Sequence, residues 1–77
     1  MARVIIVSPV RYGKTGYERC AEQDASLFSV SELKTEPRYG EGWFPLYSQE
    51  ADAHGYMFRS KVSAEAFAAK ERANHGL

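Results

Sequence analysis

Apolar and β-branched side chains dominate the N-terminal positions and predict a strand over residues 2–10. The run from Val4 to Val7 is apolar at consecutive positions, which is typical of a strand covered on both faces near the centre of a sheet. Pro9 has no backbone N–H to donate, so we expect the strand to end or become irregular near it. Two glycines within residues 11–16 then predict a turn.

The pattern after this turn does not distinguish strand from helix. Residues 17–23 fit a second strand that pairs back on the first, and they fit a short helix almost as well. Residues 26–31 place Phe28 and Val30 on one face of a strand. The stretch 29–32, Ser-Val-Ser-Glu, also matches a capping box, which would start a helix there.

Proline and glycine divide the second half of the chain. A proline and two glycines in residues 35–42 predict a loop. Residues 43–48 are aromatic and favour a strand, and Pro45 places that strand at a sheet edge or a bulge. Residues 49–55 predict a connection with room for one helical turn, and residues 56–60 predict a further strand.

The C-terminal segment predicts a helix over residues 64–73, because nearly every residue in it favours that conformation. Ser63 is the expected N-cap, His75 lies near the negative end of the helix dipole, and Gly76 is the expected stop. The apolar stripe expected on this helix consists of one large and three small residues: Phe67, Ala66, Ala69 and Ala73. We expect Phe67 to be the main contact between the helix and the sheet.

These elements predict an α+β fold, in which a small antiparallel sheet of three to five strands carries the C-terminal helix on one face. The chain has 77 residues, which is enough for a single domain over residues 1–77. A small-molecule pocket of about 300–1,000 Å³ would hollow out most of such a domain. Size therefore favours a surface that binds a macromolecule over a metabolic enzyme.

The charges of the chain cancel overall but are unevenly distributed. Ten basic and ten acidic side chains give a formal net charge of zero. Residues 21–52 hold seven acidic and two basic side chains, and both flanking segments are basic. Proteins that grip nucleic acid show a basic excess, whereas an acidic segment attracts a basic protein surface.

The single cysteine, Cys20, cannot form an internal disulfide and favours a reducing, cytoplasmic location. The N-terminal apolar run stops at Ser8 and is too short for a signal peptide or a membrane span. We therefore expect no membrane association.

Motifs for cofactors, metals or catalysis are incomplete. Residues 8–15 end in Gly-Lys-Thr like a phosphate-binding P-loop, but Ser8 replaces the first glycine and Pro9 removes a donor, so a hairpin turn is predicted. Cys20 and the histidines lack zinc-like spacing. We expect no cofactor and no metal.

Arginine and aromatic residues gathered around glycines mark the candidate binding surface, because these residue types dominate binding hot spots. The candidate partner-binding residues form two clusters, one after residue 35 and one near residue 11: Glu36, Arg38, Tyr39 and Glu41, with Arg11 and Tyr12. Of the neighbouring Trp43 and Phe44, we expect at least one to be buried.

The leading interpretation is a small non-enzymatic binding protein, monomeric or homodimeric, that acts as an inhibitor or adaptor on a protein partner. Its acidic and aromatic residues would cover a basic nucleic-acid-binding surface of that partner. Accessory proteins of bacteriophages and mobile elements, including anti-CRISPR inhibitors, are the class with which we associate it. No motif in the chain is specific to a family.

Two alternatives come from other functional classes. The first is a nucleic-acid-binding module with a basic face of five residues: Arg3, Arg11, Lys14, Arg19 and Arg59. The second is a small ribonuclease-type toxin that uses His54 for acid–base chemistry.

Overall fold

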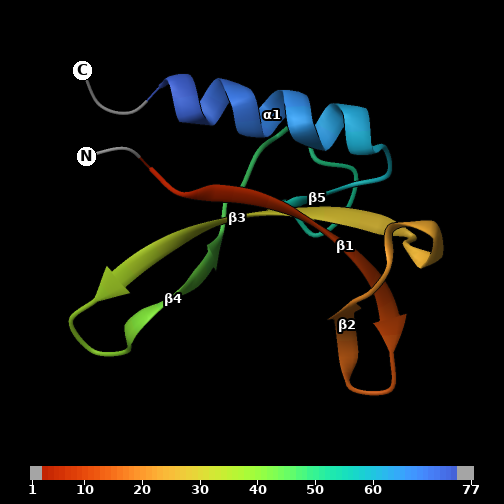
Figure 1. Ribbon diagram of the computed structural model, residues 1–77, viewed down its shortest axis with the longest axis horizontal. Helices are drawn as coiled ribbons and strands as arrows, with labels where there is room; N and C mark the ends of the chain where they lie inside the picture. Colours follow the sequence, from red (N-terminus) through yellow and green to blue (C-terminus); the bar gives the residue numbers. More distant parts are fainter. Residues whose placement is uncertain (1–2, 75–77) are drawn as a thin grey trace.

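The computed structural model describes residues 3–74 and shows a curled antiparallel sheet with an α-helix across one face (Figure 1). The elements are β1 (Ile5–Gly13), β2 (Gly16–Arg19), the 3₁₀ turn η1 (Glu22–Asp24), β3 (Leu27–Glu36), β4 (Gly40–Pro45), β5 (Met57–Phe58) and α1 (Lys61–Ala73). The predicted α+β architecture, with an antiparallel sheet and a C-terminal helix on one face, is confirmed.

The sheet has the order β2-β1-β3-β4, and β5 also pairs with β3. Since β4 pairs with residues 31–36 and β5 with residues 28–29, the two strands follow one another along the same side of β3. β1 lies inside the sheet, and β4 lies at its edge, where Pro45 is tolerated. Figure 1 shows the β1–β2 and β3–β4 hairpins extending away from α1.

β1 continues through Pro9 to Gly13, so the expectation that the strand ends at the proline is wrong. The N–H and C=O of one strand residue point to the same side of the strand. The carbonyl of Pro9 accepts a hydrogen bond from the N–H of Cys20 at 3.1 Å, on the β2 side. The position that lacks an N–H at Pro9 is therefore on the β2 side, beyond the last residue of β2. Pro9 does not direct this position toward β3, so pairing between β1 and β3 is not interrupted.

The ambiguous segment after β1 contains both local structures. β2 ends at Arg19, and the next residues form a short 3₁₀ turn, so residues 17–23 are neither wholly strand nor wholly helix. The capping-box pattern in residues 29–32 does not start a helix, because these residues lie in the middle of β3. Pairing on both sides of β3 overrides this local signal.

The loop predicted over residues 35–42 is mostly hairpin. β3 extends to Glu36 and β4 begins at Gly40, which leaves only residues 37–39 in the turn. Gly40 has a φ of 74°, and this left-handed conformation lets the chain reverse over so few residues. The turn projects its side chains beyond the sheet.

The connection after β4 contains turns and no helical turn. Ala53 forms an isolated bridge with Met57, and the predicted strand over residues 56–60 is reduced to β5. Both residues of β5 are buried, because Met57 and Phe58 pack into different apolar clusters. Because β5 is buried on both faces, it holds the connection before it in place.

The main core lies between the sheet and α1. Its buried residues come from three strands, the helix and the segment after β4: Ile5, Val30, Leu46, Phe58, Ala64, Phe67 and Ala68. The rings of Phe58 and Phe67 have centroids 5.6 Å apart. Phe67 is therefore the large contact from the helix, as predicted.

The stripe of small residues around Phe67 differs from the prediction. Ala64 and Ala68 are fully buried, whereas the expected Ala66, Ala69 and Ala73 are exposed. Ala64 lies three residues before Phe67 and Ala68 one residue after it, and both face the sheet together with Phe67. The three predicted alanines lie to either side of this narrow stripe. The expectations for His75 and Gly76 lie outside the described residues.

The helix begins three residues earlier than predicted, and Ser60 is its N-cap. The Oγ of Ser60 accepts a hydrogen bond from the backbone N–H of Ser63 at 3.3 Å. Ser63, which the sequence predicted as the N-cap, instead supplies the backbone N–H that the cap residue Ser60 accepts.

The cap assignment predicts unequal effects of two neighbouring substitutions. Ser60→Ala should lower the free energy of unfolding by about 1 kcal/mol, because it leaves an N–H of the first turn without its acceptor. Ser63→Ala keeps that acceptor and should change stability by less than about 0.5 kcal/mol. Urea unfolding of both variants measures the difference, and equal losses would contradict the assignment.

An ion-pair network joins the C-terminal end of α1 to the sheet. Arg3 donates to both carboxylate oxygens of Glu32, each at 2.8 Å, and also lies 3.4 Å from the carboxylate of Glu71. The Glu32 side chain is 8 % exposed, and its hydrogen bond with Arg3 lowers its pKa. Arg72 donates to the carbonyl of Ile5 at 2.8 Å. Both arginines therefore hold the helix against β1 and β3.

Candidate binding surface

The face of the sheet away from α1 has no helix over it among the described residues. Val30 packs against the helix, so even-numbered positions of β3 face α1 and odd-numbered positions face the opposite side. Strand pairing extends this assignment to the neighbours of β3. Besides serine and threonine, the opposite face carries apolar and aromatic side chains: Ile6, Val10, Tyr12, Tyr17, Leu27, Leu33, Trp43 and Pro45. Of these, Val10 and Leu27 are buried in a second apolar cluster with Met57.

Four of the predicted partner-binding residues lie on the β3–β4 hairpin. Arg38 and Tyr39 lie in its turn, where Tyr39 is 78 % exposed. Glu36 pairs with Gly40 and faces the α1 side, whereas Glu41 lies on the opposite face and is exposed. The turn therefore presents an arginine and a tyrosine, with one carboxylate on each face of the hairpin behind it.

The other two predicted residues lie at the far end of the sheet. Because β1 and β3 are antiparallel, the hairpins that follow them project from opposite ends. Tyr12 is 74 % exposed and packs edge-to-face on Tyr17 with centroids 5.3 Å apart. The guanidinium of Arg11 lies 3.3 Å from the carboxylate of Glu18. The structure thus separates Arg11 and Tyr12 from the other four residues.

Trp43 belongs to the surface, and neither it nor Phe44 is fully buried. Its side chain is 42 % exposed, and Phe44 is half-buried, so the expectation that one of them lies in the core is wrong. Trp43 pairs with Leu33 on the face away from α1, at the sheet edge. An edge strand covers large side chains from one side only, which leaves the indole accessible.

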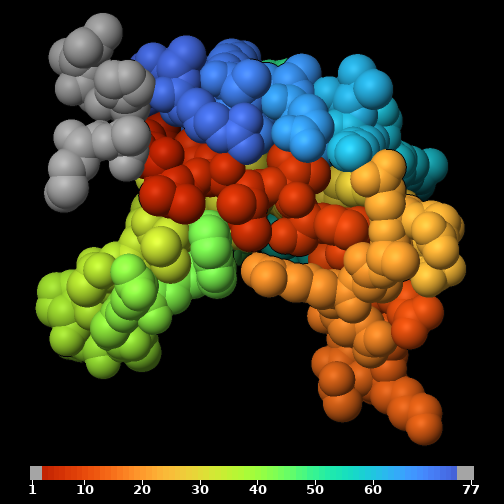
Figure 2. All heavy atoms as spheres, in the orientation of Figure 1, coloured from red at the N-terminus to blue at the C-terminus, as the bar shows by residue number. Residues whose placement is uncertain are grey.

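The two hairpins enclose a hollow. Figure 2 shows open space between the yellow-green end of the β3–β4 hairpin and the orange β1–β2 hairpin, beneath the red atoms of β1. Among the described residues, four of the five exposed aromatic side chains lie on the two hairpins: Tyr39 and Trp43 on one, and Tyr12 and Tyr17 on the other. The fifth, Tyr47, lies in the connection after β4.

The basic residues considered for nucleic-acid binding are dispersed. Arg3 is held by Glu32 and Glu71 at the start of β1, far along the strand from Lys14. Arg11 is paired with a carboxylate, as described above. Of the predicted basic residues, Lys14 and Arg19 lie on the β1–β2 hairpin and form none of the salt bridges found among the described residues. Only these two therefore form a local basic group on that hairpin.

His54, the candidate acid–base residue, lies on the surface with a tyrosine as neighbour. Its Nε2 is 3.2 Å from the hydroxyl of Tyr17, and the two rings pack edge-to-face at 5.0 Å. His54 has a φ of 55°, a left-handed conformation that is uncommon outside glycine but occurs more often in histidine than in most residues. These contacts fasten the loop before β5 to the β1–β2 hairpin.

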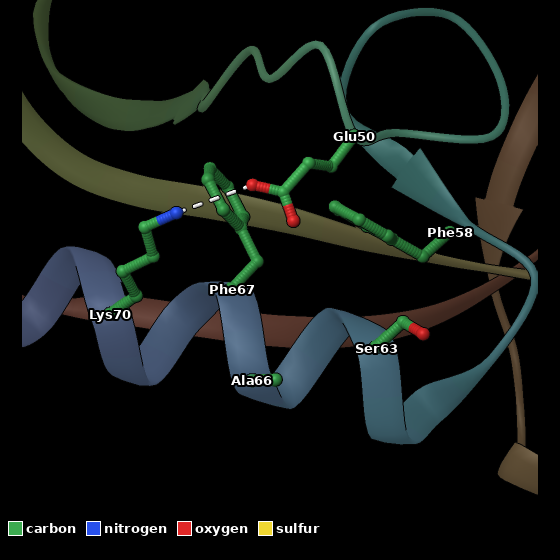
Figure 3. A pocket seen from close by; sticks show the side chains of 6 residues that line it. All are labelled: Glu50, Phe58, Ser63, Ala66, Phe67 and Lys70. Atoms are coloured by element: carbon green, nitrogen blue, oxygen red, sulfur yellow. Dashed lines mark hydrogen bonds and ion pairs between the residues drawn. The ribbon is translucent and has the colours of Figure 1, made fainter.

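A shallow cleft lies on the other side of the molecule, between α1 and the segment after β4 (Figure 3). Its volume is about 250 Å³, and the rings of Phe58 and Phe67 form its floor. Glu50 and Lys70 point toward one another across it and form an ion pair at 3.3 Å. Because both rings are less than a tenth exposed, the cleft offers a ligand little apolar surface.

The P-loop-like stretch forms a hairpin, as predicted. Residues 8–13 are the end of β1, and Gly13 pairs with Gly16 across the turn. The backbone N–H groups of this stretch lie in an extended strand, whereas a phosphate cradle requires them to converge.

Neither a metal-binding cluster nor a helix able to span a membrane is present in the part of the chain that the structure describes. Within residues 3–74, no three His, Cys, Asp or Glu side chains are grouped so that they could hold a metal ion. None of the helices described there has the length and apolar character needed to cross a bilayer.

The chain was compared with models of known families, with curated proteins and with solved structures. None of the three comparisons gave a match.

Proposed function

We propose that this protein is a non-enzymatic binding protein that acts as an inhibitor or adaptor on a protein partner. The observation that carries the proposal is the β3–β4 hairpin, which exposes Arg38, Tyr39 and Trp43 together. Tyrosine, tryptophan and arginine dominate protein-binding hot spots because they offer large contact areas with few rotatable bonds.

The charges of this hairpin favour a protein partner over a nucleic acid. Lys34 and Arg38 are balanced by Glu36 and Glu41, so the hairpin has no basic excess with which to hold phosphates. The carboxylates suit a partner with a basic patch, including a surface that itself binds nucleic acid. Inhibitors of host defence, such as anti-CRISPR proteins of bacteriophages, are the class in which we place the proposal, with the cytoplasm as the location.

The experiment is capture of the partner from a nuclease-treated bacterial lysate by the tagged chain. The wild-type chain should retain a protein that a variant with alanine at the four hairpin residues does not: Glu36, Arg38, Tyr39 and Glu41. All four side chains lie outside the buried core, so the melting temperature of this variant should stay close to that of the wild type.

The chain supplies a matched control, because Arg-Tyr-Gly occurs in both hairpins. The double variant Arg11→Ala, Tyr12→Ala removes the same side chains from the β1–β2 hairpin and should capture the partner normally. Loss of capture by this control alone would move the binding surface to the other hairpin. Capture of nucleic acid instead of protein, in lysate without nuclease, would contradict the proposal.

A further inference from the structure

We infer that the free edge of β4 binds an extended strand of the protein partner, in which a basic and an apolar residue stand two positions apart on one face. This inference rests on the proposed function and specifies how the partner is held. It concerns the backbone of the edge strand, whereas the proposed function concerns the side chains of the hairpin turn.

The backbone of β4 has hydrogen-bonding groups that its own sheet leaves free. Leu46 donates its N–H to the carbonyl of Val30 at 3.0 Å, so even-numbered residues around β4 direct their backbone groups toward β3. Glu41, Trp43 and Pro45 therefore direct theirs outward, where no strand pairs among the described residues. Because proline has no N–H, the edge offers donors and acceptors at Glu41 and Trp43, and an acceptor at Pro45.

The side chains beside these groups define what an added strand should carry. Glu41 and Trp43 share the face away from α1, and Trp43 is 42 % exposed. Among the residues that β3 and β4 place on this face, Glu41 is the only charged one. No salt bridge to it occurs in the described part of the chain. An added strand would pair an apolar side chain with the indole and a basic one with the carboxylate.

The shape of this edge suits an extended chain. A strand adds to a sheet at a spacing of about 4.8 Å, which bulky side chains directed along the edge would obstruct. Gly40 and Gly42 have no side chains, so on the α1 side of the β4 edge only the Phe44 ring, which lies beside Gly42, stands near an added strand. In Figure 2 the yellow-green end of this hairpin borders the hollow described above, which leaves room beside it. Strand addition of this kind is a common way to bind an extended peptide.

The experiment uses a capped synthetic valine–lysine peptide as the probe. Valine and lysine stand two positions apart in it, with threonine between them, so that both side chains lie on one face of the added strand. Trp43 is the only tryptophan of the chain, so its fluorescence reports directly on the edge. The peptide should shift the emission to shorter wavelength in a saturable way. A peptide of the same length with glutamate in place of lysine should bind at least about tenfold more weakly, because it opposes Glu41 with a like charge.

Two substitutions of Glu41 separate the contribution of its backbone N–H to peptide binding from that of its side chain. Glu41→Pro removes an outward N–H at an edge position where proline is tolerated, and should weaken binding of the valine–lysine peptide by about fivefold to tenfold. Glu41→Ala keeps that N–H, so it should still bind this peptide but should no longer distinguish it from the valine–glutamate peptide. Circular dichroism of both variants checks that the sheet is retained.

Amide hydrogen exchange tests the geometry in the unmodified protein. The valine–lysine peptide should slow exchange of the amides of Glu41 and Trp43, while those of Gly42 and Phe44, already directed to β3, should change little. The inference is overturned if no amide is slowed, or if both peptides bind equally. It is also overturned if the fluorescence shift appears without peptide as protein concentration rises, which would indicate a second copy at the edge.

The outcomes also separate this inference from the proposed function. If Glu41→Pro captures the protein partner as well as the wild type does, strand addition fails while the hairpin turn remains the binding site. If the four-residue hairpin variant also captures it normally, the proposed function fails as well.

Discussion

Replacing Phe67 with alanine should lower the free energy of unfolding by about 3–5 kcal/mol, the largest effect expected of any single substitution in this molecule. The side chain is 8 % exposed and contacts the ring of Phe58 between the helix and the sheet. Alanine would leave a cavity there, because the neighbouring Ala64 and Ala68 are too small to fill it. A domain of this size has modest total stability, so urea or thermal unfolding should show a large shift.

Val62→Ala is the matched control for Phe67. Val62 lies on the same helix but is 79 % exposed, so its truncation should change stability by less than about 0.5 kcal/mol. An unchanged melting temperature for Phe67→Ala would contradict the packing of α1 on the sheet. A loss of equal size in both variants would indicate a general effect on the helix instead.

Replacing Arg3 with alanine should lower the free energy of unfolding by about 3 kcal/mol at neutral pH. The substitution removes both hydrogen bonds to the carboxylate of Glu32, whose side chain is only 8 % exposed. A nearly buried carboxylate without its cation is costly, which makes the loss larger than that of a surface ion pair. Arg3 also donates to the backbone carbonyl of Glu71, so the end of α1 should loosen too.

The pH dependence of stability separates this ion pair from simple loss of packing. Arg3 holds the pKa of Glu32 below its ordinary value, so the pair stabilises the fold fully above the unfolded-state pKa of about 4.3. This stabilisation is lost as the pH falls through the lower, folded-state pKa. In Arg3→Ala, burial without a cation raises the pKa of Glu32, so acidification should narrow the stability gap between variant and wild type. Urea unfolding at pH 7 and near pH 3 measures this gap, and a constant gap would contradict the assignment.

The sequence predicted those parts of the fold that local patterns determine. The apolar run at Val4 to Val7 indicated the inner strand β1, and the alanine-rich segment indicated α1 with Phe67 as its anchor. The continuation past Pro9 could not be predicted, because it depends on where the neighbouring strand β2 ends. The same holds for the pairing of Arg3 with Glu32, which are 29 positions apart.

The candidate surface was predicted in composition but not in arrangement. The sequence indicated Arg38 and Tyr39 as exposed, and the turn of the β3–β4 hairpin places them so. It could not show that Arg11 and Tyr12 lie at the opposite end, since strand order decides this. The sequence could not decide between Trp43 and Phe44, because a shift of one position in register moves a side chain to the other face of a sheet.

The position of α1 after all the strands has a consequence for synthesis of the chain. The helix supplies Phe67, Ala64 and Ala68 to the core, and its partners on β1 lie almost the whole length of the sequence away. A ribosome would therefore release every strand before the residues that cover the apolar side of the sheet. We expect the core between the sheet and α1 to form only after translation of the helix. A stalled chain without the helix should therefore aggregate or recruit chaperones.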